Sequence, residues 1–140
     1  RVANGVDRNR LAMVLAVLVR NGGPALANAD VFVNVAGGVR IDEPGADLAV
    51  ALAIASAHRG ESLADSDGRP LACFGEVGLT GELRSVAHAD RRVAEARKFG
   101  LGPVLAPPPV DAIPGLAPQA TLRDALRAAL GGRAPKRAAA

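Results

Sequence analysis

The chain has 140 residues, which suits one domain, and 49% of them are hydrophobic although only 2% are aromatic. Its longest uninterrupted apolar runs, residues 11–19 and 48–55, are far shorter than the ~20 residues that a membrane-spanning helix needs. A single cysteine, Cys73, excludes an internal disulfide. The net charge of +3 and the pI near 10.0 are compatible with a polyanionic partner, but equally with an arginine-rich composition alone. We expect a piece of a longer protein, because the sequence opens with Arg1 rather than Met. We expect that protein to be cytoplasmic with no membrane partner, because no signal peptide precedes the first helix and the apolar runs are short.

The first half of the chain predicts two apolar helices with a strand between them. Asp7 is a good N-cap for a helix over residues 8–20, and the apolar run in that helix predicts burial around most of its circumference. Residues 24–28 are a candidate for a short strand. Residues 31–36 are rich in β-branched types and predict a strand. A buried helix over residues 48–59 follows.

The loop between that strand and the buried helix is the obvious place for a site. Gly37-Gly38 permits a positive φ or a close backbone approach, and Pro44 suits the first turn of a helix. Acidic residues place negative charge near the positive end of the helix. They are Asp42, Glu43 and Asp47.

The second half of the chain predicts shorter elements. Residues 71–86 alternate apolar pieces with glycines, which suits a hairpin with a bulge. The other expected elements are an amphipathic helix over 89–99, a strand over 103–106, a turn or brief strand at 112–113, and a helix over 122–130. Because helices and strands alternate, the fold class is α/β or α+β, with a small sheet packed with helices. We expect one domain over residues 1–132 and a flexible basic tail over 133–140.

The residues needed for three common kinds of catalytic site are missing or scattered. Neither lysine is followed by Ser or Thr, so the chain has no P-loop motif. Cys73 and the two histidines stand apart in the sequence, which disfavours a metal site. Ser85 and His88 stand at i, i+3, but a surface turn explains them better than a nucleophile and its base.

Three segments carry a resemblance to a known family. They are NGVDRNRLAMVLAVL, VFVNVAGGVRIDEPGADLAVALAIAS and FGEVGLTGELRSV with the following RRVAEARKFG. These segments resemble the C-terminal domain of the bacterial RadA (Sms) family of DNA-repair ATPases, which is similar to the proteolytic domain of Lon. The resemblance covers roughly residues 4–108. It implies a Lon-like fold, similar to the second domain of a small-subunit ribosomal protein.

The resemblance to Lon can be examined at the two positions of its serine–lysine dyad. The serine of Lon peptidases lies in a Gly-Pro-Ser-Ala-Gly run, which matches residues 43–47 and puts Gly45 at the serine position. The lysine position in the helix after the hairpin matches Asp90. Glycine has no side chain, and a carboxylate cannot replace the neutral amine that takes a proton from serine. We therefore expect no enzymatic activity from this fragment, and an active Lon-type peptidase is the disfavoured alternative.

The RadA resemblance also implies properties of the intact protein. Members of that family join a zinc finger and a RecA-like, DNA-dependent ATPase to this domain, assemble into homo-hexameric rings and promote branch migration in recombination. ATP, Mg and Zn would then bind in the preceding part of the protein, with no cofactor in this fragment. The partners implied are single-stranded or branched DNA, further copies of the chain and a RecA-type recombinase.

Arginines are the candidates for DNA contact. Without Trp or Tyr, base stacking is a poor route to binding, whereas contact between arginine and phosphate remains open. The candidates are Arg40, Arg84, Arg91 and Arg92. They could equally form a solvated face with internal pairs, such as Arg91 with Glu95. The sequence thus leaves open a nucleic-acid-binding module and a pure protein–protein scaffold.

Overall fold

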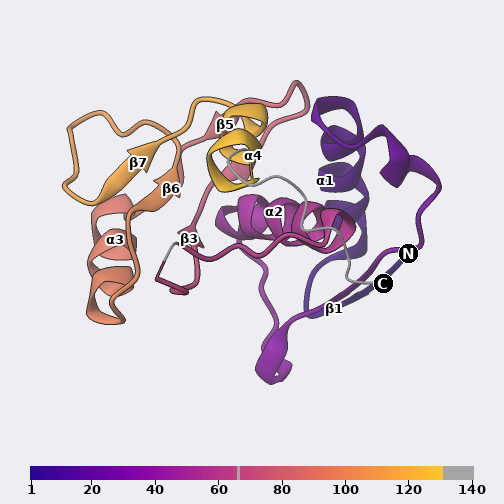
Figure 1. Ribbon diagram of the computed structural model, residues 1–140, viewed down its shortest axis with the longest axis horizontal. Helices are drawn as coiled ribbons and strands as arrows, with labels where there is room; N and C mark the ends of the chain where they lie inside the picture. Colours follow the sequence, from indigo (N-terminus) through magenta and orange to yellow (C-terminus); the bar gives the residue numbers. More distant parts are fainter. Residues whose placement is uncertain (66, 131–140) are drawn as a thin grey trace.

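The computed structural model describes residues 1–65 and 67–130 (Figure 1). The tail predicted for residues 133–140 lies outside this part, as does the predicted domain end at residue 132. Over the described residues the chain forms four α-helices and several short strands, an α/β arrangement as predicted. No helix among them is long and apolar enough to cross a membrane.

Three helices pack around the main hydrophobic core. They are α1 (Arg8–Asn21), α2 (Asp47–Arg59) and α4 (Leu122–Leu130). Helix α2 contacts both of the others and lies at the centre of the molecule (Figure 1). Leu48 and Leu52 of α2 are almost fully buried, as is Leu15 of α1. Each such side chain contributes roughly 1.5–3 kcal/mol by leaving water, so this core is the main source of stability.

The structure confirms the predicted start of α1 but corrects the extent of its burial. Asp7 accepts a hydrogen bond from the backbone N–H of Arg10 at 2.9 Å, as expected of an N-cap. The apolar run predicts burial on most sides, whereas Ala12 and Ala16 are exposed. The buried positions of α1 form one stripe, and alanine is small enough to remain in water at little cost.

Residues 24–28 do not form the predicted strand. They form a 3₁₀-helix, η1 (Pro24–Asn28), that packs against α1. The physical reason is the proline at its start, which has no N–H to donate to a sheet and whose φ suits the first turn of a helix.

The predicted strand over residues 31–36 is present but shorter. It is β2 (Phe32–Asn34), and it pairs in parallel with β1 (Val2–Asn4). A second 3₁₀-helix, η2 (Ala36–Gly38), ends it, with Gly37 at φ 82°. That conformation favours glycine, so the Gly-Gly pair turns the chain as its sequence indicates.

The hairpin predicted for residues 71–86 is confined to its second part. Strands β4 (Glu76–Val77) and β5 (Leu83–Arg84) form the antiparallel pair. Strand β3 (Ala72–Cys73) instead pairs in parallel with β6 (Val104–Ala106), a partner distant in sequence. Gly75, at φ 155°, separates the two strands and allows the chain to change direction.

The C-terminal part adds one helix to the other end of the molecule. Helix α3 (Ala89–Lys98) buries Val93 in a second apolar cluster with Phe74 and Val104, away from α1 (Figure 1). The brief strand considered at 112–113 is absent from the described residues there. The third strand of the β3–β6–β7 sheet is β7 (Leu116–Pro118), which begins after a turn at Gly115.

Candidate functional site

The residue at the expected serine position lies in a turn that leads into α2. This turn is a short 3₁₀-helix, η3 (Pro44–Ala46), with Gly45 buried at its centre. The carbonyl of Gly45 accepts a hydrogen bond from the N–H of Gly75 at 2.9 Å, and the carbonyl of Gly75 accepts one from the N–H of Leu48 at 3.1 Å. Backbone hydrogen bonds therefore fix this position, but it carries no nucleophile.

An ion pair occupies the space in front of Gly45. The guanidinium of Arg92 meets both carboxylate oxygens of Glu43, with Nη1–Oε1 at 2.6 Å and Nη2–Oε2 at 3.0 Å. Hydrogen bonding from Arg92 lowers the pKa of Glu43, so the pair stays ionised at neutral pH. A Cβ atom on Gly45 would clash with the Glu43 carboxylate and lie 3.2 Å from Nη1 of Arg92. Glycine thus leaves room for the ion pair at the expected serine position.

Arg92 makes two further contacts besides its ion pair. Its Nε donates to the carbonyl of Ala87 at 2.9 Å, and its guanidinium lies 5.6 Å from the ring centre of Phe74. With 28% of its side chain exposed, Arg92 is the most enclosed of the four candidate arginines. The carboxylate of Asp90, at the expected lysine position, is exposed in the first turn of α3, where negative charge suits the helix dipole.

A second ion pair ties the start of α2 to α1. Asp47 is 2% exposed, and its two carboxylate oxygens accept from Nε and Nη2 of Arg10 at 2.5 and 2.7 Å. The backbone N–H of Val77 donates to Asp47 at 3.1 Å, and Glu76 lies 3.7 Å from Arg10. Hydrogen bonding to Asp47 raises the pKa of Arg10. This cluster is satisfied within the chain, so its role is structural.

The four arginines predicted to contact DNA differ in how they are held. Arg40 pairs with Asp42 and Arg84 with Glu82, each at 2.8 Å. Arg92 is held by Glu43, as described above. Arg91 is exposed on α3 and has no ion pair among the described residues, its suggested partner Glu95 being paired with Lys98. The four lie on a loop, a strand and a helix, and their contact with DNA remains a prediction.

Comparison with known proteins identifies the relatives of the chain. No protein-family model matches it. The DNA repair proteins RadA of Escherichia coli and Halalkalibacterium halodurans are 49% and 47% identical to it over 107 residues, and RadA of Streptococcus pneumoniae is 44% identical over 108 residues. Each match covers 76% of this chain. The chain is homologous to the C-terminal region of RadA DNA repair proteins.

The match to RadA concerns only part of those proteins. The chain spans 22–24% of the length of these curated relatives. In the described residues of this RadA homologue, no three of the metal-binding residue types His, Cys, Asp and Glu come together as a metal site.

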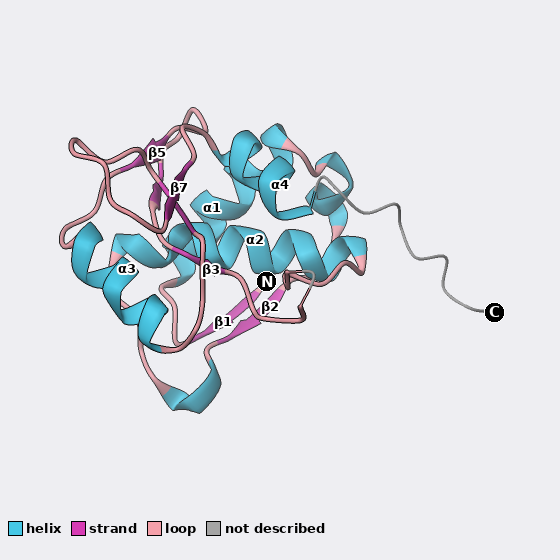
Figure 2. Ribbon diagram, turned by 60° about the vertical axis from the view of Figure 1, so that its left-hand side comes forward, coloured by secondary structure: helices cyan, strands magenta, loops and turns pink. Residues whose placement is uncertain are grey.

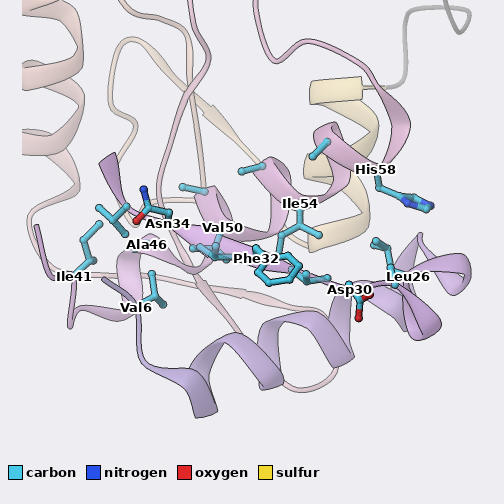
Figure 3. A pocket seen from close by; sticks show the side chains of 17 residues that line it. Val6, Leu26, Asp30, Phe32, Asn34, Ile41, Ala46, Val50, Ile54 and His58 are labelled. Atoms are coloured by element: carbon cyan, nitrogen blue, oxygen red, sulfur yellow. The ribbon is translucent and has the colours of Figure 1, made fainter. Parts of the chain in front are cut away.

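Two surfaces of this RadA homologue escaped the sequence analysis. A polar hollow of about 410 Å³ is lined by Arg8 and Arg40, which lie 32 positions apart in the numbering and gave no joint signal. An apolar groove of about 540 Å³ runs between β2 and α2, with Val50 and Ile54 on the helix side and Phe32 on the strand side (Figure 3). The ring of Phe32 is exposed, and which face of the short β1–β2 pair stays uncovered is decided only by the tertiary structure.

Proposed function

We propose that the chain is the Lon-like, proteolytically inactive C-terminal domain of a RadA-type ATPase that acts in DNA repair and recombination. In this proposal it contacts single-stranded or branched DNA and helps to join subunits of a homo-hexameric ring during branch migration. The proposal rests on two observations. The chain is homologous to RadA, and Gly45 with the Glu43–Arg92 pair beside it stands at the expected serine position, where no nucleophile is present. ATP, Mg and Zn would bind outside these residues, and a RecA-type recombinase would be a further partner.

Loss of peptidase activity is tested with the purified chain. We expect no cleavage of casein and no labelling by a serine-reactive fluorophosphonate, because Gly45 supplies no hydroxyl and the exposed Asp90 supplies no amine. The variant Gly45→Ser should remain inactive, since its side chain would meet the Glu43 carboxylate rather than a base. Stoichiometric labelling of the natural chain at any serine would revive the peptidase hypothesis.

DNA binding is tested by titrating labelled single strands and duplexes at several salt concentrations. If about four arginines contact phosphates, log K should fall against log salt with a slope of roughly −3 to −4, and sequence should matter little. Arg91 is the best candidate for a direct contact because it is exposed and unpaired among the described residues. Arg91→Ala should make the slope shallower by about 0.7–0.9. The control is Arg127→Ala on α4, which removes the same charge from another helix.

A pure protein–protein scaffold is the second candidate. One observation favours it: three of the four candidate arginines already have carboxylate partners. Under this hypothesis the chain binds no DNA even at low salt, and Arg91→Ala changes nothing. Subunit association is measured by sedimentation of the chain and of the intact protein with nucleotide and DNA. A monomeric intact protein under those conditions would contradict the ring.

A further inference from the structure

The loop that carries Arg40 projects from the body of the molecule. This Arg40 loop, residues 36–43, includes η2 and extends away from α2 in both views (Figure 1 and Figure 2). Its contacts with the rest of the chain come late in the loop. The N–H of Ile41 donates to the carbonyl of Gly5 at 2.8 Å, and the side chain of Glu43 reaches Arg92 on α3. The contacts that hold the loop thus include a bridge between Ile41 and the segment at Gly5 and Val6, and the ion pair to α3.

We propose that the Glu43–Arg92 pair is a clamp that positions the Arg40 loop for phosphate binding. Arg92 then acts through the loop, as a positioning residue, and does not itself contact phosphate. The clamp joins residues 49 positions apart, so it fixes the loop relative to α3. The DNA part of this inference rests on the proposed function; the clamp itself does not.

The hydrogen bonding of the two arginines supports different roles for them. All three nitrogens of the Arg92 side chain have partners within the chain, two on Glu43 and one on Ala87. Each terminal nitrogen keeps one further N–H, but the side chain is only 28% exposed, so a phosphate must compete with a bidentate carboxylate for the charge of Arg92. Arg40 pairs with Asp42, and their side chains are 75% and 68% exposed. Such an ion pair is weak, so a phosphate can readily replace Asp42 as the partner of Arg40. Arg40 also lines the polar hollow beside Arg8.

The variant Glu43→Gln separates a clamp from a direct phosphate contact by the sign of its effect. If Arg92 contacts phosphate, removing the competing carboxylate and its negative charge strengthens DNA binding. If Glu43 and Arg92 form a clamp, the same change weakens binding, about two- to tenfold, although the chain becomes more positive. Arg92→Lys should weaken binding likewise, since it keeps the charge but loses the bidentate geometry. The control, Glu95→Gln on the same helix, removes an equal charge without touching the loop and should not weaken binding.

Coupling to Arg40 tests whether the clamp acts through the loop. In the natural chain, Arg40→Ala should make the salt slope shallower by about 0.7–0.9. In the Glu43→Gln background the same substitution should add little, because the loop no longer presents Arg40. Additive effects of the two substitutions would overturn the positioning role.

Hydrogen exchange tests the clamp without DNA. Amides of residues 36–43 should exchange about two- to tenfold faster in Glu43→Gln and in Arg92→Lys, while the amides of α2 and the unfolding midpoint stay unchanged. Unchanged exchange in the loop would overturn the clamp. Faster exchange with stronger DNA binding would overturn its link to DNA. If the natural chain binds no DNA, the proposed function fails, and loop exchange alone then decides whether the clamp exists.

Discussion

Substitution of Arg10 should destabilise the chain more than any other loss of a single surface-accessible arginine. The substitution Arg10→Ala leaves the carboxylate of Asp47, 2% exposed, with the N–H of Val77 as its only hydrogen-bond donor among the described residues. Removing one partner of a buried ion pair costs about 3–5 kcal/mol, and the 26% exposure of Arg10 implies that water reaches part of the site. We therefore expect a loss of about 2–4 kcal/mol, a large share of the stability of a small domain.

Urea unfolding followed by circular dichroism measures this loss, since the chain has no Trp or Tyr for fluorescence. The midpoint should fall while the m-value stays constant. The milder variant Asp47→Asn keeps the shape and an oxygen for the N–H of Val77, so it should cost about 1–3 kcal/mol and remain folded if Arg10→Ala does not. Arg20→Ala, at the exposed end of the same helix, is the control. Losses below about 0.5 kcal/mol in both test variants would refute the assignment of this pair as a structural anchor.

Three further predictions concern single side chains. Burial raises the pKa of the partly buried Cys73 thiol to about 12, so a thiol reagent at pH 8 should label the native chain much more slowly than the unfolded chain; equally rapid labelling of both would contradict this. A hydrogen bond from Thr80, with help from Arg84, lowers the pKa of Glu82 from 4.5 to about 2. Because the pKa of Glu82 is lower in the folded chain than in the unfolded one, the natural chain should be more stable than Glu82→Gln above pH 4.5, and this advantage should shrink toward pH 2. The unfolding midpoints of both chains, measured across this pH range, test this; a difference that does not change with pH would argue against it. Leu48→Ala truncates a fully buried side chain in the central helix and should lower the free energy of unfolding in urea by about 2–5 kcal/mol. A loss under about 1 kcal/mol would contradict this and would mean that neighbouring side chains fill the cavity.

Local chemistry determined much of this fold in advance. The N-cap at Asp7, the whole of α4 and the start of the buried helix near Pro44 follow from short-range signals in the sequence. The absence of a serine at position 45 and of a lysine at position 90 is also plain from the sequence alone. These features need no information about distant residues, because caps, periodicity and residue identity act within a few positions.

Tertiary structure decided which residues meet. Nothing in the sequence pairs β3 with β6 instead of with its neighbour, and nothing links Glu43 to Arg92 or Asp47 to Arg10. Charged residues lack the periodic pattern that reveals a buried face, so a partner 37 or 49 positions away leaves no local trace. For the same reason, the sequence could identify an arginine on the polar face of α3 but not that Arg92 is enclosed and Arg91 free to contact a partner. That distinction depends on the loop that the fold brings against the helix.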